Sequence, residues 1–444
     1  MKANRIDLFS FRTPAMRAFH VAWVSFFLCF FGWFGVAPLM PVIRKELGLT
    51  SEQVGNVVIA SVSATVLARL GVGWLCDRFG PRRIYAALLV VGALPVMGIG
   101  LARDYESFLA FRFAIGAVGA SFVITQYHTT AMFAPNVVGT ANATAAGWGN
   151  LGGGVTQVVM PFVFAAFVTL GFSSSSAWRV AMIVPGVLML VAAAAYLLFT
   201  QDTPEGRFVR PAAAQGTSQR FLSAARDGRT WILALAYGAC FGVELTVHNV
   251  AALYFHDRFE LDLKTAGLVA GSFGVLALFA RTLGGFAGDR VGKRLGLKGR
   301  VATLAAVLAA EGLALVLFSR MTVLPLAVAT LVVFGLFTHM SAGATYAVSP
   351  FVRRDAVGAV TGIVGAGGNA GAVAAGFLFR SDTAGMQTAF LVLGIAVVAS
   401  AALVLLVRFT AADEATNRLE LTRAAGAAST AGAGNAGVLP AAAE

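Results

Sequence analysis

The sequence predicts an all-α membrane protein with 12 transmembrane helices in two pseudo-symmetric six-helix bundles. Three observations carry this prediction: an apolar composition, twelve apolar runs of membrane-spanning length, and an internal repeat. Of the 444 residues, 58% are hydrophobic and 12% are charged, whereas soluble proteins carry roughly 25% charged residues. A soluble globule of this size would lack polar surface, so the composition argues against a cytosolic enzyme.

Helices of spanning length follow from the apolar runs. A bilayer core about 30 Å thick needs about 20 apolar residues per helix. Twelve segments meet this requirement, at 18–41, 52–76, 84–102, 107–132, 140–170, 178–200, 231–256, 266–288, 301–319, 323–347, 358–379 and 386–408. The first is too long and too aromatic for a cleavable signal, so we expect it to be retained.

The basic residues predict the orientation of these helices. The formal charge of +12 comes from short clusters between the apolar runs, which indicates topology rather than nucleic-acid binding. With both termini cytoplasmic, about two thirds of the 33 Lys and Arg residues fall inside, as the positive-inside rule requires. We expect a multi-pass protein of the cell inner (plasma) membrane, monomeric in the lipid bilayer. The three cysteines have no disulfide or zinc-ligand spacing, and we expect no metal or cofactor.

Four regions are expected along the chain. Residues 1–200 form the N-terminal bundle and residues 231–409 the C-terminal bundle. Residues 201–230, rich in Pro, Gly, Gln and Ser, form a cytoplasmic loop between them. Residues 410–444 end in an Ala/Gly-rich run with few large apolar side chains, which predicts a disordered cytoplasmic tail.

The two bundles repeat one another. A shift of 212 residues superposes Ala68-Arg69 on Ala280-Arg281 and Asp77-Arg78 on Asp289-Arg290. A shift of 219 residues superposes Gly149-Asn150 on Gly368-Asn369. In transporters, such duplication builds paired helical bundles around a site at the membrane midplane.

Two arginines are the strongest candidates for a binding site. Arg69 lies eight residues before Asp77 on the membrane side, about 12 Å from the boundary and near mid-bilayer, and Arg281 has the same offset from Asp289. An arginine at this depth is costly, so it normally faces a cavity. A planar, permanently charged guanidinium suits a small planar oxyanion. The alternative is that each arginine is satisfied by carbonyls or a buried acid and only holds helices together.

Glycine tracts surround an asparagine in each half. They run over 147–154 and 365–371, with Asn150 and Asn369 at matching places beside Gly149 and Gly368. Glycine allows close helix packing, but packing does not explain a buried amide that needs partners. We expect both asparagines to hydrogen-bond a ligand.

Two resemblances refine this interpretation. The segment 73–83, with Asp77 and Arg78, resembles the loop-2/3 motif of the major facilitator superfamily, and 285–294, with Asp289 and Arg290, resembles its second copy. The resemblance implies a cytoplasmic gate in which Asp77 holds basic groups and a helix end. The chain also resembles the nitrate/nitrite porter family along nearly its whole length. The resemblance is carried by residues 9–14 and 35–41, Arg69, both glycine tracts and Arg281. In that family the arginines clamp nitrate and the tracts lie beside it, which implies those roles here.

The seventh span, 240–255, resembles that of assimilatory nitrate transporters. Glu244 lies about 20 Å along this helix. A desolvated glutamate binds protons more readily, so we expect Glu244, with His248 one turn away, to couple nitrate import to protons. Moving a monoanion inward against the membrane potential costs about 2.3 kcal/mol per 100 mV. With two protons per nitrate, the net charge moved is positive, so the membrane potential favours uptake. The alternative is that Glu244 only forms an ion pair with a clamp arginine and carries no proton.

Other functions stay open at this stage. Nitrate/nitrite exchange would use the same clamp without protons, and a nitrate sensor would bind without transport. Arg112, followed by Gly116 and Gly119, resembles a superfamily motif of proton-driven members, although helix–helix packing explains it nearly as well. Glu311 in the ninth span has no assigned role.

Overall fold

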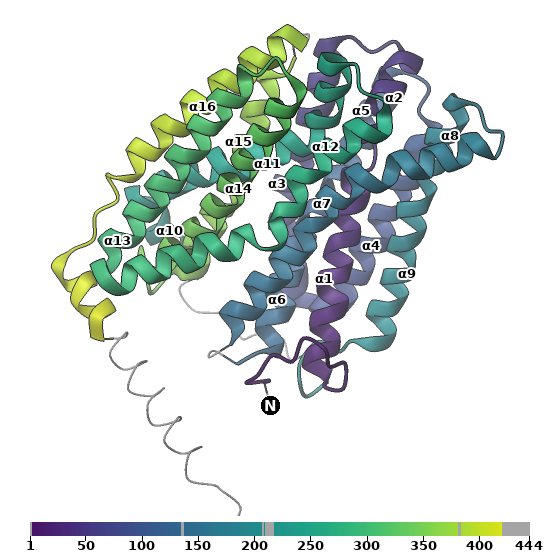
Figure 1. The fold of residues 1–444 in the computed structure, drawn as a ribbon. Helices are drawn as coiled ribbons and strands as arrows, with labels where there is room; N and C mark the ends of the chain where they lie inside the picture. The colour runs from purple at the N-terminus through teal and green to yellow at the C-terminus, as the bar shows by residue number, and fades with distance from the viewer. Residues whose placement is uncertain (1, 135–136, 207, 209–216, 381–382, 420–444) are drawn as a thin grey trace, which may run out of the picture.

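The computed structural model describes residues 2–134, 137–206, 208, 217–380 and 383–419 (Figure 1). The secondary structure of this part is helical, apart from an isolated β-bridge between Ala3 and Phe133. The N-terminal half comprises α1 (Pro14–Trp33), η1 (Ala37–Leu39), α2 (Met40–Leu47), α3 (Ser51–Phe79), α4 (Pro81–Gly98), η2 (Ile99–Leu101), α5 (Tyr105–Gly116), η3 (Ala117–Ala120), α6 (Ser121–Met132), α7 (Val138–Thr169), α8 (Ser174–Ala181) and α9 (Ile183–Phe199).

The C-terminal half begins with a short helix, α10 (Thr217–Arg226), inside the predicted inter-bundle loop. It continues with α11 (Gly228–Phe259), α12 (Leu263–Val275), η4 (Leu276–Leu278), α13 (Ala280–Ser319), α14 (Leu324–Val348), η5 (Ser349–Phe351), α15 (Val357–Leu378) and α16 (Thr383–Val404).

Local sequence explains where these helices begin and end. At the start of α3, the Thr50 hydroxyl accepts a hydrogen bond from the Gln53 amide while the Gln53 side chain accepts one from the Thr50 amide, a reciprocal cap. The helix before it ends at Gly48, whose φ of 61° is left-handed and favours glycine. The turn between α2 and α3 therefore follows from residues 48–53.

Eleven helical segments of the described residues are long and apolar enough to cross a membrane. One of them, Leu263–Ser319, has 57 residues, which is about 85 Å of helix and far more than one bilayer. It contains two predicted spans, 266–288 and 301–319, and its backbone leaves the helical region at Gly296, with φ 71° and ψ −157°. The twelve predicted spans thus correspond to eleven segments, one of which bends back at Gly296.

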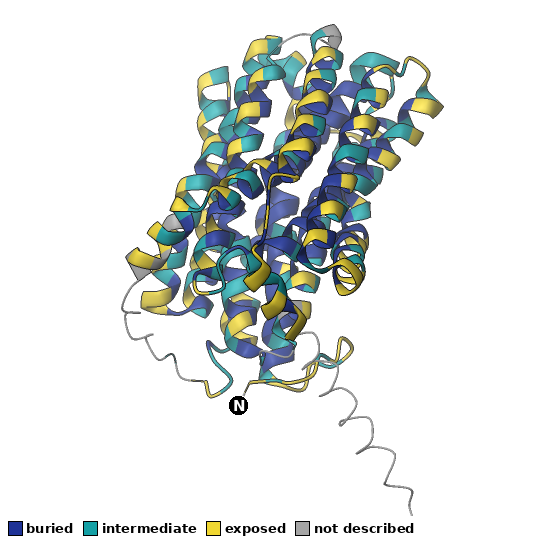
Figure 2. Ribbon diagram, turned by 90° about the vertical axis from the view of Figure 1, so that its left-hand side faces the viewer, coloured by how far each residue is buried: buried dark blue, intermediate teal, exposed yellow. Residues whose placement is uncertain are grey.

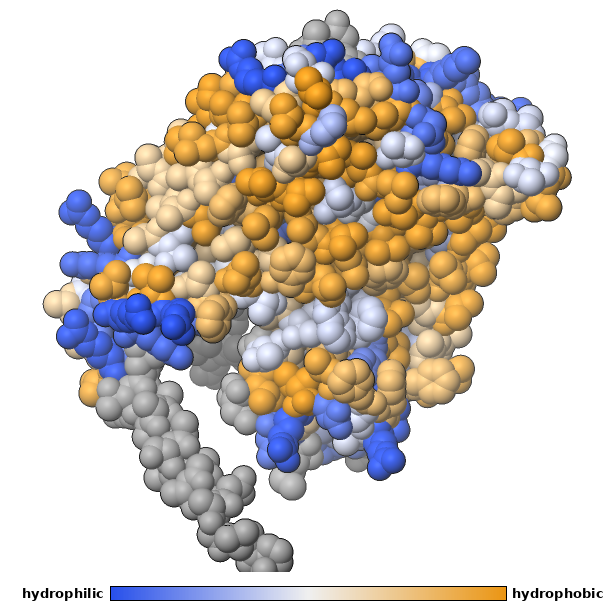
Figure 3. All heavy atoms as spheres, in the orientation of Figure 1, coloured by the Kyte–Doolittle hydropathy of each residue, from blue (hydrophilic) through white to orange (hydrophobic). Residues whose placement is uncertain are grey.

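An apolar band crosses the face of the molecule that is seen in Figure 3. Figure 3 shows hydrophobic side chains across the middle of the visible face and hydrophilic ones toward its two ends. Large apolar residues of this band are exposed, including Leu101, Leu198 and Leu313. Figure 2 shows buried residues along the helix faces that point inward. An exposed apolar band over a buried interior is the surface that a bilayer requires.

The two halves contact each other through α3 with α15 and through α7 with α12. Glycines allow the closest approaches. A Cβ atom on Gly154 of α7 would lie 2.6 Å from the Gly274 carbonyl carbon of α12, and one on Gly55 of α3 would lie 2.7 Å from the Arg380 Cα atom. Both distances are too short for a real Cβ contact, so these seams require glycine.

The predicted tail begins later than residue 410. Residues 411–419 are helical, and the Glu414 carboxylate accepts hydrogen bonds from the Leu297 and Lys298 amides at 2.9 and 3.1 Å. This contact stabilises the bend at Gly296, because the backbone amides of Leu297 and Lys298 would otherwise lack hydrogen-bond acceptors. The rest of the predicted tail, 420–444, lies outside the described residues.

Candidate functional site

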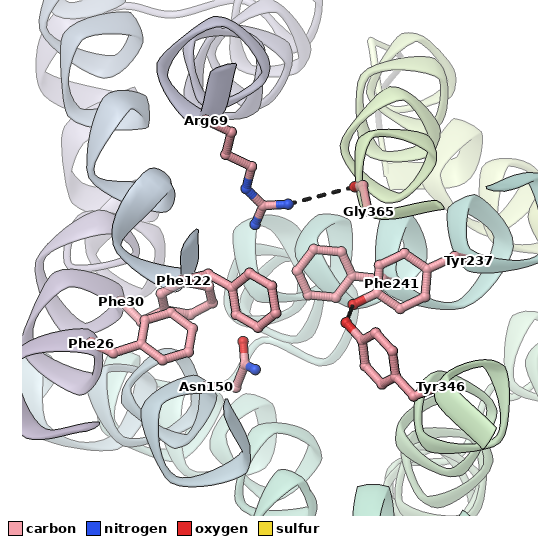
Figure 4. Close-up of a pocket in the computed structure, with 9 residues that line it drawn as sticks. All are labelled: Phe26, Phe30, Arg69, Phe122, Asn150, Tyr237, Phe241, Tyr346 and Gly365. Carbon is pink, nitrogen blue, oxygen red and sulfur yellow. Dashed lines mark hydrogen bonds between the residues drawn. The ribbon is translucent and has the colours of Figure 1, made fainter. Parts of the chain in front are cut away.

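A small pocket lies between the two halves (Figure 4). The N-terminal half contributes α1, α3, α6 and α7 to its walls, and the C-terminal half contributes α11, α14 and α15. The lining residues are Phe26, Phe30, Arg69, Phe122, Asn150, Tyr237, Phe241, Tyr346 and Gly365. The pocket is therefore a mostly aromatic cavity with one cation and one amide, at the boundary that the internal repeat predicts.

Arg69 on α3 points into this pocket (Figure 4). Its Nε donates to the Gly119 carbonyl at 3.4 Å and its Nη1 to the Gly365 carbonyl of the other half at 3.5 Å. No carboxylate of the described residues lies within 4.0 Å of it. Two long hydrogen bonds to neutral carbonyls leave most of its charge uncompensated, so Arg69 can bind an anion.

Arg281 has a different environment. It lies in the first turn of α13, directly after the helix breaks at η4 and Phe279. Its Nη2 donates to both carboxylate oxygens of Glu244, at 2.7 and 2.5 Å. Both residues are buried, with 8% of Arg281 and none of Glu244 exposed. Glu244 therefore neutralises Arg281 in this conformation.

The two guanidinium groups converge on one aromatic ring. The Phe241 ring centroid lies 6.0 Å from the Arg69 Cζ atom and 5.6 Å from the Arg281 Cζ atom. The two Cζ atoms are therefore at most about 12 Å apart. Arg281 does not line the pocket, but each half contributes one arginine to the surroundings of the Phe241 ring, whose faces attract cations.

The two asparagines have matching environments. Asn150 on α7 donates to the Ala146 carbonyl at 2.8 Å, and Asn369 on α15 donates to the Gly365 carbonyl at 3.2 Å. Each Oδ1 is buried without a partner among the described residues. Asn150 lines the pocket, whereas Asn369 does not. Asn369 instead binds the same Gly365 carbonyl that accepts from Arg69.

The glycines beside the asparagines seat aromatic rings. A Cβ atom on Gly149 would lie 1.8 Å from Phe26 Cδ1, and one on Gly368 would lie 2.7 Å from both Phe241 Cδ1 and Tyr237 Cδ1. All three rings line the pocket. Gly149 and Gly368 thus shape the pocket through its aromatic walls rather than by facing it, and they also pack helices, the role that glycine usually has in membranes.

A second histidine, His339, contacts Glu244 directly. The His339 Nδ1 atom on α14 is 3.4 Å from Glu244 Oε2, and both side chains are fully buried. The ring of His248 packs against Phe34 and Phe273, with centroids 5.1 and 5.6 Å away, and its ring nitrogens have no hydrogen-bond partner among the described residues. Spacing on α11 favoured His248, because the sequence does not reveal which face of α14 meets Glu244.

The loop motif of the N-terminal half is open. Asp77 and Arg78 are exposed, and within the described chain neither forms an ion pair; the Arg78 guanidinium instead lies over the Trp74 and Phe79 rings. The N-terminus of α4, which follows the motif, is held by Asp202, whose carboxylate accepts a hydrogen bond from the Arg82 amide at 2.9 Å. In the second copy, Asp289 pairs with Arg300 and Arg290 is exposed.

Two ion pairs join the halves at the face remote from the termini. Arg44, in α2, binds both carboxylate oxygens of Asp257 at 2.6 and 2.7 Å, and Arg380 pairs with Glu52. The molecule is therefore closed there, while Asp77 and Arg78 at the termini face form no ion pair with another described residue.

Several site residues were not singled out from the sequence. The Tyr237 and Tyr346 hydroxyls are 2.6 Å apart at the pocket wall, and the Phe241 ring lies within 6.0 Å of both arginine Cζ atoms. Single aromatic residues in apolar helices carry no signal that separates a pocket wall from lipid contact. No group of three His, Cys, Asp or Glu side chains that could hold a metal ion occurs in the described part of the chain.

Comparison with known proteins agrees with this architecture. Residues 22–310 match the family model of the Major Facilitator Superfamily. A solved bacterial homologue of the human lysosomal transporter Spinster, inward-facing and unoccupied, superposes with a TM-score of 0.73 at 16% identity, covering 89% of this chain and 97% of that one. The nucleoside transporter NupG superposes with a TM-score of 0.66 at 14% identity, covering 88% and 99%.

Sequence relatives narrow the family. The chain is 40% identical to high affinity nitrate transporter 2.5 of Arabidopsis thaliana, over 92% of this chain and 82% of that protein. It is 38% identical to nitrate transporter 2.1 of Chlamydomonas reinhardtii, over 87% and 72%. The nitrate/nitrite transporter NrtP of Nostoc punctiforme is 27% identical, over 88% and 91%. These matches confirm the predicted fold and resemblance: the chain belongs to the Major Facilitator Superfamily, in its nitrate/nitrite porter family.

Proposed function

We propose that this protein imports nitrate together with protons, by alternating access around the pocket between the two halves. Nitrate binds between Arg69 and Arg281, one guanidinium from each half. The observation that carries the proposal is the ion pair between Arg281 and Glu244, because the Glu244 carboxylate binds the same guanidinium that nitrate would bind. Nitrate and Glu244 therefore compete for Arg281.

The competition couples nitrate to a proton. When nitrate binds Arg281, Glu244 loses its counterion. A buried carboxylate without a cation is strongly disfavoured, so Glu244 takes up a proton. When nitrate leaves, Arg281 recovers Glu244 and the proton is released. Nitrate and one proton then cross together, and the charge of the site is the same in the empty and loaded states.

A second proton would let the membrane potential drive uptake. The nearest titratable neighbour is His339, 3.4 Å from Glu244. His248 stays a predicted coupling residue, since it lies one turn along α11 from Glu244. Either imidazole could gain a proton once its surroundings change, because histidine titrates near neutral pH.

The remaining pocket residues fit a small planar anion. Arg69 supplies a guanidinium without a carboxylate partner, and Asn150 supplies an amide. The aromatic rings, including Phe122 and Phe241, exclude water from the anion and offer flat faces for stacking. Asn369 acts indirectly: it donates a hydrogen bond to the Gly365 carbonyl and so fixes the position of this acceptor beside Arg69. Gly149 and Gly368 hold the rings in place.

Alternating access would follow from the two gates. The ion pairs at the face remote from the termini break when that face opens, and the loop motifs of Asp77 and Asp289 close the other. We place the termini in the cytoplasm and the protein in the plasma membrane, because the basic clusters lie on the termini side. Nitrite is a second substrate of the same chemistry, and assimilation of nitrate is the matching role.

Exchange of nitrate for nitrite is the rival mechanism. It is favoured if the Arg281–Glu244 pair is permanent, so that no proton moves. Proteoliposomes with nitrite inside and no pH gradient decide between them. Symport predicts that uptake needs an inward proton gradient and that Glu244→Gln abolishes this need. Uptake that nitrite alone supports fully, and that Glu244→Gln leaves unchanged, would overturn the proposal. A sensor would bind nitrate without accumulating it.

A further inference from the structure

Arg112 is a buried cation that the proposed mechanism does not use. It lies on α5 with 1% of its surface exposed. Its Nη1 donates to the Trp33 carbonyl at 2.7 Å and its Nη2 to Asn249 Oδ1 at 2.8 Å. Its Nε has no partner, and no carboxylate of the described chain lies within 4.0 Å. Because a guanidinium does not lose its proton, the positive charge is held here by neutral oxygens alone.

The contact with Asn249 crosses the boundary between the halves. Arg112 and Trp33 belong to the N-terminal half, whereas Asn249 lies on α11 of the C-terminal half. The Ser61 hydroxyl of α3 lies 3.4 Å from the same Asn249 oxygen. When the halves separate at the face remote from the termini, Asn249 leaves, and the Arg112 Nη2 donor faces the opening.

Arg112 also lies on the way to the pocket. Ser61 marks its level on α3, and Arg69 follows eight residues later on the same helix, about 12 Å closer to the termini face. From the remote face inward, an anion would therefore meet the Arg112 guanidinium first and the Arg69 guanidinium second. Both belong to the N-terminal half, and neither has a carboxylate partner among the described residues.

We propose that Arg112 forms an entry site for the anion, in which nitrate takes the place of the Asn249 amide oxygen when the remote face opens. This inference rests on the proposed transport function. In the closed state, the Trp33 carbonyl and the Asn249 amide hold the guanidinium in position. In the open state, its charge raises the local anion concentration above Arg69 and speeds binding, as single-sign clefts do.

Uptake of labelled nitrate into right-side-out and inside-out membrane vesicles tests the proposal. For Arg112→Gln, half-saturation at the remote face rises about tenfold, while the maximal rate stays within about twofold. Arg112→Lys, which keeps the charge, stays within about threefold of wild type. At the termini face both variants resemble wild type, because Arg112 is covered when that face is open. Unchanged half-saturation at the remote face in Arg112→Gln, or an equal rise at both faces, overturns the entry site.

Asn249→Ala separates an entry site from a simple latch. It breaks the same hydrogen bond as Arg112→Gln but keeps the charge, so half-saturation at the remote face does not rise. If the Arg112–Asn249 hydrogen bond only holds the remote face closed, both variants favour the open state, and half-saturation at the remote face falls in both. If Arg112→Gln fails to insert, Asn249→Asp carries the test: its carboxylate neutralises Arg112, half-saturation at the remote face rises, and an unchanged value overturns the proposal. Wild type that accumulates no nitrate contradicts the transport function itself, not the entry site.

Discussion

Glu244 and Arg281 form a buried ion pair in which one guanidinium nitrogen contacts both carboxylate oxygens, at 2.7 and 2.5 Å. The Arg281 guanidinium lies over the ring of Phe241, and so does the Arg69 guanidinium. Arg69 is thus ready to bind an anion, whereas Arg281 must first release its own carboxylate. In the mechanism that we propose, this asymmetry between two arginines at equivalent positions of the repeat links the anion to the proton.

Glu244→Gln should release nitrate transport from the proton gradient. The amide cannot neutralise Arg281, so nitrate meets a free cation and its affinity rises at least about tenfold, or ~1.4 kcal/mol. Uptake then proceeds as exchange, with no dependence on external pH. Tracer uptake at several pH values measures this. Retention of the wild-type pH dependence would show that the proton binds elsewhere.

Arg69→Lys and Arg281→Lys should both abolish nitrate binding while the protein still inserts. Lysine keeps the charge but loses the planar fork of donors that matches an oxyanion. We expect a loss of at least about a hundredfold in affinity, equal to ~2.7 kcal/mol, by calorimetry on purified protein. Arg353→Lys, at an exposed pair with Asp355, is the control and should bind normally. Wild-type affinity in either clamp variant would refute the clamp.

The ion pairs at the remote face should set the balance between conformations. Arg44→Gln removes the pair with Asp257, which is partly exposed and contributes about 1 kcal/mol. The fraction open at that face then rises about fivefold. A cysteine at Ser61 in a protein without its native cysteines reports this through its rate of labelling by an impermeant thiol reagent. Equal labelling rates with and without Arg44 would mean that the pair does not hold the face closed.

The seam between α7 and α12 should tolerate only glycine. An alanine at Gly154 would place its Cβ 2.6 Å from the Gly274 carbonyl carbon and 2.7 Å from its Cα, a backbone contact that side-chain movement cannot relieve. The remote face then cannot close, and transport falls at least about tenfold, since ~1.4 kcal/mol against closure is enough. Gly362→Ala, with nothing within 4 Å of its Cβ, should transport normally. A Gly154→Ala protein as active as this control would contradict the seam.

The sequence predicts the spans, the repeat and the depth of Arg69 and Arg281 because hydropathy and spacing are local properties. It does not predict the partners of these residues, which depend on helix rotation and tilt. Thus His339 on α14 reaches Glu244 while His248 on α11 turns toward Phe34 and Phe273. The role of Asp202 at the N-terminus of α4 was missed for the same reason, since it lies 120 residues from Arg82.

Proton uptake on nitrate binding tests the central claim, that nitrate and Glu244 compete for Arg281. Titration calorimetry of the purified protein at neutral pH, repeated in buffers of different ionisation enthalpy, counts the protons taken up. We predict about one proton per nitrate for wild type, because a Glu244 displaced from its cation must be neutralised, and none for Glu244→Gln. Nitrate binding to wild type without proton uptake would contradict the account.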